Sequence, residues 1–378
     1  MKRILFGAAS AAALLTAGSA LAAGNSATID QVGVSQYAAV NQTGSSSDAD
    51  ATVTQAGGYN SASVTQGGSG NQAVVDQSQG SYGAVRNPSN IANSNQQGTN
   101  GALNVVQVGN NTSSILQEAG SANEHALVGQ SNNYNSSSID QAGNSELAVV
   151  NQQDGTGNSA SILQAGTGDG VYAPLLYPTH AAGPGNLVWH ENVPSTSVLP
   201  GASGGYTEYG YAGAIVDQVG SNNVGGINQD GYWNFADVSQ ENDSDPGGNS
   251  GSITQGAGTY YSDAVMYQLG QYNVASIAQV GAGSSYSTIW QYGDSNMAYS
   301  TQSGSNHSAI EQGFLDDLGH VSTPVTGDYA AVTQTGGGDT SEVRQTGDYD
   351  TALVSQVGAN ATALITQGGS SNYASISQ

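Results

Sequence analysis

The chain has 378 residues, no cysteine, four basic residues against 28 acidic ones, and a formal charge of −24. This balance argues against nucleic acid and anionic membranes as partners, and the absence of cysteine excludes a disulfide scaffold. Only 8% of the residues are charged and 54 are glycine, so composition alone would also fit a disordered polar segment. Periodic apolar residues would exclude that alternative.

The first 22 residues have the features of a secretory signal peptide. Lys2 and Arg3 precede an apolar run, and the small-residue site Ala20-Leu21-Ala22 follows it. The run is too short and too rich in Ala and Gly to span a bilayer, and no later segment qualifies, so we expect no integral membrane segment after cleavage. Cleavage would leave a formal charge of −26, because it removes two basic residues and no acidic one. The sequence therefore predicts a secreted or cell-surface protein.

From residue 25 onward the chain repeats the unit Asn-x-Ala-x-Ile/Val-x-Gln-x-Gly, as in "NSATIDQVG" (25–33) and "NVASIAQVG" (273–281). We align 24 units on glutamine, and 12 of the 23 spacings between successive glutamines are 11 residues. Two residues before glutamine the side chain is Ile, Val or Met in 23 units, with Ser300 as the exception. Weaker copies around Asn87, Gln96 and Gln130 fill the two larger gaps in the first half.

The marked residues fall at every second position, which is the period of a β-strand. An 11-residue period also fits a right-handed helical coil, but Gly and Asn weaken helices and the apolar column is β-branched. One such strand cannot bury enough apolar surface alone, so the units must stack. We predict an all-β, amyloid-like β-solenoid of stacked strand-turn-strand rungs, with two 11-residue units and about 22 residues per rung. The glycine after glutamine would supply a positive φ at the turn.

Stacking would place like residues above one another at about 4.8 Å, so the amides would form ladders and the Ile/Val and Ala columns a thin dry core. The predicted ladder glutamines are Gln31, Gln42, Gln55, Gln66, Gln77, Gln141, Gln164, Gln218, Gln229, Gln279, Gln334, Gln345, Gln356, Gln367 and Gln378. The predicted ladder asparagines are Asn25, Asn60, Asn158, Asn223, Asn273 and Asn372. The predicted core positions are Ile29, Val53, Val64, Ile162, Ile277 and Ile376.

One long segment interrupts the repeats. Residues 167–211 hold five of the eight prolines, several aromatic residues and no repeat unit. We therefore divide the chain into a signal peptide (1–22), a first repeat half (23–166), this insertion and a second repeat half (212–378). A loop extruded from the stack is the simpler interpretation of the insertion, and an adhesive or partner-binding element is the alternative.

The strands "NSASILQAG" and "STIWQYGDSNMAYSTQ" resemble the repeats of curlin, the subunit of curli fibres, in which Ser-x5-Gln and Asn-x5-Gln strands alternate around Gly-rich turns. Related bacterial amyloid proteins use similar repeats. The resemblance implies a self-assembling extracellular fibre for biofilm matrix and surface adhesion, with a nucleator subunit and a curli-type outer-membrane secretion pore as partners. The chain departs from curlins in its longer array, its insertion, and repeats that begin without a preceding targeting segment.

Other chemistry is weakly supported by the sequence. The five histidines are scattered without metal-ligand spacing, and no serine lies in a recurring pattern with a histidine or carboxylate, so we expect no metal, no cofactor and no enzyme activity. The outward Thr residues of "ATVTQ" suggest ice binding, but the same column also takes Asp, Leu and Trp. The alternative to a fibre subunit is a monomeric cell-surface β-solenoid adhesin or binding module. The last unit ends on Gln378 with its columns complete, so we expect a docking edge there.

Overall fold

The computed structural model describes residues 12–17, 24–43, 47–78, 89–166, 178–180, 187–189, 213–242, 247–281, 283–315 and 321–378. The chain forms two compact units, residues 1–167 and 168–378. In the described ranges all regular structure is β-strand, and no helix there is long and apolar enough to cross a membrane. The predicted all-β class is confirmed.

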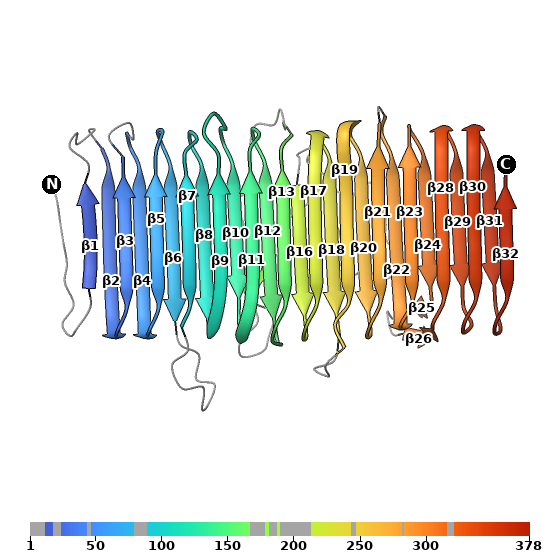
Figure 1. The fold of residues 1–378 in the computed structure, drawn as a ribbon, viewed down its shortest axis with the longest axis horizontal. Helices are drawn as coiled ribbons and strands as arrows, with labels where there is room; N and C mark the ends of the chain where they lie inside the picture. The colour runs from blue at the N-terminus through green and yellow to red at the C-terminus, as the bar shows by residue number, and fades with distance from the viewer. Residues whose placement is uncertain are drawn as a thin grey trace. The chain divides into compact units, whose positions relative to one another are not determined.

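The first unit consists of two parallel sheets in which each strand pairs with the next but one along the chain (Figure 1). One sheet contains β1 (Ala12–Ala17), β3 (Tyr37–Gln42), β5 (Ser61–Gln66), β7 (Ile91–Gln96), β9 (Asn110–Gln117), β11 (Asn133–Gln141) and β13 (Ser159–Gln164). The other contains β2 (Ser26–Val34), β4 (Asp50–Gly58), β6 (Gln72–Ser78), β8 (Ala102–Val108), β10 (His125–Gln130) and β12 (Leu147–Gln153).

The second unit repeats this arrangement. One sheet contains β17 (Val224–Tyr232), β19 (Ser250–Tyr260), β21 (Val274–Val280), β23 (Met297–Ser303), β28 (Tyr329–Gly337), β30 (Thr351–Ala359) and β32 (Tyr373–Ser377). The facing sheet contains β16 (Gly213–Val219), β18 (Phe235–Glu241), β20 (Asp263–Leu269), β22 (Tyr286–Asp294), β24 (His307–Gln312), β29 (Thr340–Gln345) and β31 (Thr362–Gln367). The short β27 (Val325–Thr326) also pairs with β22.

The register keeps the repeat columns aligned. Between β21 and β23, for example, Gln279 lies opposite Gln302 and Ala275 opposite Ala298. Because side chains alternate along a strand, the Ala, Ile/Val and Gln positions all face the opposite sheet, and the intervening positions face outward. Two successive units thus form one rung of a β-solenoid, as predicted.

Two predicted segments lie mostly outside the described residues. Within the predicted signal peptide, residues 12–17 form β1, which pairs in parallel with β3. Within the predicted insertion, β14 (Pro178–His180) and β15 (Leu187–Trp189) form an antiparallel pair. A second antiparallel pair, β25 (Phe314–Leu315) and β26 (Val321–Thr323), lies between β24 and β27. Cleavage of residues 1–22 and the role of residues 167–211 stay predictions.

The glycine two residues after glutamine enters the left-handed region, as the sequence predicts for the turn. At Gly336 φ is 130°, and a Cβ atom there would lie 1.5 Å from the carbonyl oxygen of Gly358 on the next rung. Glycine is therefore required at this position for two reasons: the positive φ angle and the close approach of the stacked turns.

We expect Gly336→Ala to destabilise the second unit by about 3 kcal/mol or more, because the added methyl group collides with main chain that cannot move away. The adjacent Gly337→Ala is the matched control, since a Cβ there meets nothing within 4 Å and its φ is not positive. Denaturant unfolding of the two variants would measure the difference. Equal stability of the two variants would contradict this account of the turn.

Candidate assembly site

The inward glutamines form continuous side-chain ladders within each unit. Gln279 is typical: its Nε2 donates to Oε1 of Gln302 at 3.1 Å and to the main-chain oxygen of Asp263 at 3.0 Å. Its Oε1 accepts from Nε2 of Gln255 at 2.9 Å. Both amide hydrogens and the oxygen are thus satisfied, which is what a buried amide requires.

Four such ladders are present, one per sheet in each unit, with Nε2–Oε1 distances of 2.6–3.3 Å. In the first unit they run through Gln31, Gln55, Gln77, Gln107, Gln130 and Gln152, and through Gln42, Gln66, Gln96, Gln117, Gln141 and Gln164. In the second they run through Gln218, Gln240, Gln268, Gln291, Gln312, Gln345 and Gln367, and through Gln229, Gln255, Gln279, Gln302, Gln334, Gln356 and Gln378.

The ladders have one direction. In every one of these bonds Nε2 of the lower-numbered glutamine donates to Oε1 of the higher-numbered one. As a result Oε1 of Gln31, on the first rung of its ladder, is buried and accepts no hydrogen bond. At the other end, Gln378 uses its amide to donate to the main-chain oxygen of Thr362 at 3.1 Å.

The asparagine position, six residues before each aligned glutamine, stacks in another way. Its side-chain oxygen accepts from the main-chain N–H of the next rung, as between Asn249 and Asn273 (3.0 Å) and between Asn273 and Asn296 (3.0 Å). Its Nδ2 donates to a turn carbonyl, as from Asn273 to Gly293 at 2.7 Å. These asparagines therefore link side chain to main chain, whereas the glutamines link side chain to side chain.

The structure places the predicted residues on these columns, with differences at the ends. Val53, Val64, Ile162 and Ile277 are at most 1% exposed. Ile29, Ile376, Asn25 and Gln42 are only half-buried, and Asn372 and Gln378 are exposed. The remaining predicted ladder residues are buried, namely Gln31, Gln55, Gln66, Gln77, Gln141, Gln164, Gln218, Gln229, Gln279, Gln334, Gln345, Gln356, Gln367, Asn60, Asn158, Asn223 and Asn273.

Two weak repeat copies occupy full ladder positions. Gln96 and Gln130 belong to weak copies of the repeat, yet both are buried and form side-chain hydrogen bonds with the glutamines of the rungs on either side. The third weak copy, around Asn87, lies outside the described residues, and Asn90 takes the asparagine position of that rung instead. The sequence signal for Gln96 is faint because Ser94 replaces the Ile/Val of the unit.

Ser300, the exception in the Ile/Val column, is accommodated by a partner from the facing sheet. Its hydroxyl is 1% exposed and lies 2.8 Å from Oγ of Ser287, which donates to it. Ser287 itself occupies the small-residue position of its own strand. A buried hydroxyl thus has a hydrogen bond where an isolated one would be costly.

In the first unit, two glutamates occupy the asparagine position. They are Glu124 and Glu146, on neighbouring rungs of one sheet. Each is 1% exposed, and Oε1 of each has no hydrogen-bond partner. Burial, opposed by the hydroxyl of Ser121, raises the pKa of Glu124 to about 8. Burial also raises the pKa of Glu146 to about 7, against hydrogen bonds from the Gly143 and Gly166 main chain.

In the second unit Asp328 and Asp350 take the asparagine position on neighbouring rungs and are fully buried. Oδ1 of Asp328 accepts from the N–H of Asp350 at 2.8 Å, as an asparagine would, but Oδ2 has no partner. Burial raises the pKa of Asp328 to about 7; the hydrogen bond from Asp350 opposes this, and the charges of Asp350 and Asp348 add to it. The sequence shows Asp at the asparagine position of these units but does not reveal that these acids are buried.

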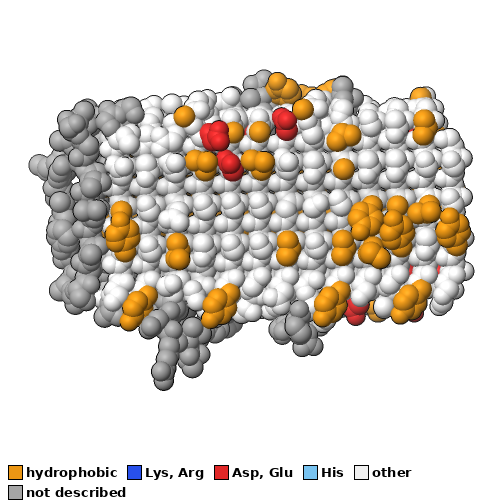
Figure 2. All heavy atoms as spheres, in the orientation of Figure 1, with side chains coloured by type: hydrophobic (Ala, Val, Ile, Leu, Met, Phe, Trp, Pro, Cys, Tyr) orange, Lys and Arg blue, Asp and Glu red, His pale blue; other side chains and the backbone are white. Residues whose placement is uncertain are grey.

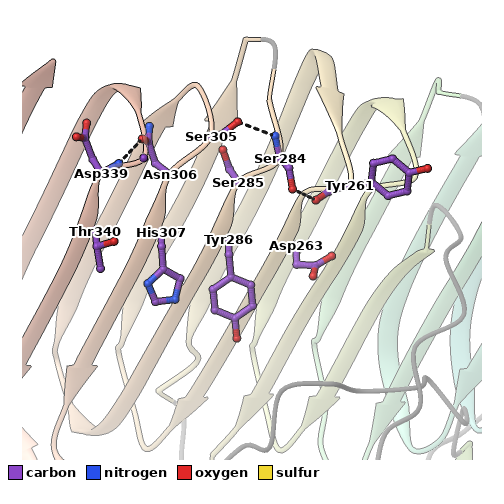
Figure 3. Close-up of a pocket in the computed structure, with 11 residues that line it drawn as sticks. Tyr261, Asp263, Ser284, Ser285, Tyr286, Ser305, Asn306, His307, Asp339 and Thr340 are labelled. Carbon is purple, nitrogen blue, oxygen red and sulfur yellow. Dashed lines mark hydrogen bonds between the residues drawn. The ribbon is translucent and has the colours of Figure 1, made fainter. Parts of the chain in front are cut away.

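A shallow groove of about 310 Å³ lies where the turns of the second unit meet strands β20, β22, β24 and β29 (Figure 3). The ring of His307 stacks on that of Tyr286, with centroids 5.0 Å apart. The hydroxyl of Ser284 donates to the main-chain oxygen of Tyr261 at 2.8 Å, and that of Ser285 to Gly304. These two hydroxyls donate to the main chain and not to the histidine, so neither serine is activated as a nucleophile.

The described residues also contain no group of three or more His, Asp or Glu placed to hold a metal ion. Of the histidines considered in the sequence, His190 and His320 lie outside them. The dominant chemical feature of the described structure is therefore the set of amide columns.

Comparison with protein families identifies the repeat. Residues 23–52 and 48–78 match the curlin associated repeat, and these two segments contain the first five ladder glutamines. A search of curated proteins found no significant match to the chain. Residues 23–78 thus match the curlin repeat, in agreement with the resemblance noted in the sequence, and they form the first rungs of the solenoid.

Proposed function

We propose that this chain is a structural subunit of an extracellular, curli-like amyloid fibre, in which copies stack end to end for biofilm matrix and surface adhesion. The curlin repeats support the class of protein. The amide ladders support the mechanism, because a column of buried amides gains hydrogen bonds from every further rung added to it.

The observation that carries the proposal is the complementarity of the first and last rungs. The first offers a buried, unpartnered acceptor, Oε1 of Gln31. The last rung offers the amides of Gln367 and Gln378, which end the two ladders of the second unit, and the ladder direction makes such amides the donors to a next rung. In a continued stack Gln367 would donate to Gln31 of the next copy, and Gln378 to Gln42. Ile29 and Ile376 are only half-buried, whereas Ile277 at an interior rung is fully buried, so joining two copies would also complete the apolar column.

Export and assembly partners belong to the same proposal. Residues 1–22 would direct export, an outer-membrane pore of the curli type would release the chain, and a nucleator subunit would start the fibre. No catalytic role is part of this function, since its chemistry is hydrogen bonding and packing. The ladder glutamines, the asparagines and the Ile/Val column are proposed as the residues that carry assembly.

Purified residues 23–378 test the proposal directly. We expect a lag, shortened by preformed seeds, followed by fibres that bind an amyloid dye and diffract with the cross-β spacings of about 4.8 and 10 Å. Persistence as a soluble β-rich monomer at high concentration would contradict it and favour the monomeric adhesin.

Blocking the last rung should slow growth. We expect Ile376→Pro combined with Gln378→Lys to reduce seeded elongation at least tenfold, because proline disrupts the pairing of β32 with β30 and so the last strand itself, and lysine replaces the ladder amide. Gln72→Lys, which makes the same charge change at an exposed, outward position of β6, is the control. If the double variant elongates as fast as this control, growth uses another surface.

A further inference from the structure

The two outer faces of the second unit differ in charge. Each repeat strand presents three outward side chains, at one, three and five residues before its glutamine. On β17, β19, β21, β23, β28, β30 and β32 these 21 positions include no Asp, Glu, Lys, Arg or His. We call this surface the odd-strand face, after β17, β19, β21 and β23, and β28, β30 and β32 also belong to it. The facing sheet presents Asp217, Asp237, Asp263, His307, Glu311, Glu342 and Arg344 at the same positions.

The odd-strand face also carries exposed apolar side chains. Met297 is 38% exposed and Tyr373 69% exposed, and the rings of Tyr299 and Tyr329 on adjacent strands lie 5.9 Å apart. Figure 2 shows hydrophobic side chains gathered over the last strands of this unit, next to uncharged atoms. Most of the other outward positions are occupied by Ser, Thr, Ala and Gly, which are small.

The composition of the chain makes such a face unusual. The mature protein has a formal charge of −26, so two copies repel wherever their acidic surfaces meet. On the outer face of the other sheet the charges persist even where they pair, as between Arg344 and Glu311 at 3.3 Å. Contact there would remove several carboxylates from water. The 21 outward positions of the odd-strand face can be covered without burying a charge, and the one charged outward residue of its strands, Asp230, lies beyond them near the end of β17.

We propose that a second copy of this chain docks face to face on the odd-strand face of residues 224–377, so that stacked subunits also associate side by side. Seven strands spaced about 4.8 Å apart, each exposing roughly 17 Å of its length, give a flat area on the order of 550 Å² per copy. The pair would bury about 1,100 Å² in total, just above the ~1,000 Å² that a specific interface needs. Docking of sheets at about 10 Å would let the tyrosines and Met297 interdigitate with small side chains opposite.

This proposal rests on the fibre function proposed above, and its test separates the two. Thr301, on β23, is exposed on the odd-strand face, and Thr340, on β29, is exposed on the opposite face. Thr301→Asp would place a carboxylate inside the docked face, whereas Thr340→Asp adds the same charge outside it. Amyloid-dye kinetics report stacking, and filament width by electron microscopy reports side-by-side association.

We expect wild-type and Thr340→Asp fibres to lie in pairs or bundles, and Thr301→Asp to form single filaments with normal dye kinetics and at least a fivefold lower bundled fraction. Bundling of Thr301→Asp at the wild-type level, equal loss in both variants, or unbundled wild-type filaments would overturn the proposal. If the wild type forms no fibres, the fibre function fails and sedimentation of the soluble chain decides: a dimer that Thr301→Asp dissociates supports face docking, and a monomer overturns it.

Discussion

Raising the pH from about 4 to 9 is expected to lower the free energy of unfolding of the solenoid, and Asp328 is the clearest cause. At the same position on the preceding rung, Nδ2 of Asn296 donates to the Val325 carbonyl at 3.2 Å. Asp328 has an oxygen, Oδ2, in place of that donor, and it is buried without a partner. Only the protonated carboxyl can donate there as asparagine does, so the neutral form fits the column and the charged form does not.

The direction of the effect follows from the pKa of Asp328, which rises from 3.8 to about 7 on folding. The folded state binds a proton that the unfolded chain has lost between these pH values, so the stabilisation is fully present below pH 4 and is lost as the pH rises through about 7. The charged groups facing Asp328 are Asp350 and Asp348, both acids, which oppose ionisation further. At 1.36 kcal/mol per pH unit, the loss is of the order of 4 kcal/mol.

Asp328→Asn should therefore match the acid form at every pH. We expect urea unfolding at pH 8 to show this variant more stable than the wild type, with little difference at pH 4. Asp230→Asn, at an exposed outward position of β17, is the control and should track the wild type. Glu124→Gln should act the same way in the first unit, where the pKa of Glu124 is about 8. A wild-type stability that does not fall between pH 4 and 9 would contradict the burial of these acids.

Interrupting a glutamine ladder at its centre is expected to be as damaging. In Gln279→Leu the volume is nearly kept, but Oε1 of Gln302, the Asp263 carbonyl and one amide hydrogen of Gln255 lose their partners. Each buried, unpaired polar group costs roughly 1–3 kcal/mol, so we expect a loss of about 4 kcal/mol. The cost is this high because the polar neighbours remain after the substitution.

The matched control is Gln72→Leu, the same change at an outward, exposed glutamine of β6. We expect it to change the denaturation midpoint little, and Gln279→Leu to lower it strongly and to increase hydrogen exchange on the flanking strands β19 and β23. A cost below about 1 kcal/mol for Gln279→Leu would show that the ladder contributes packing and few net hydrogen bonds.

Much of the solenoid could be predicted from the repeat unit. The alternation around each glutamine set the strands and the inward columns, because a period of two leaves no other way to bury Ile, Ala and Gln together. The two-unit rung followed from the need of a short strand to stack on its own copies. The position of Gly336 also followed locally, from the left-handed backbone that a tight turn requires.

Other features depended on residues that neighbouring rungs bring together from 20 to 30 positions away. Gln96 and Gln130 have weak local sequence, but the columns on either side supply their hydrogen bonds. Asp328 looks like its asparagine counterparts in sequence, and only the stacked rungs show that it is buried with an unpaired oxygen. The repeat alone thus determined which side chains face inward. The tertiary structure decided the ladder direction, the raised pKa values and the sheet whose 21 outward positions carry no charge, because each of these depends on which rungs lie next to one another.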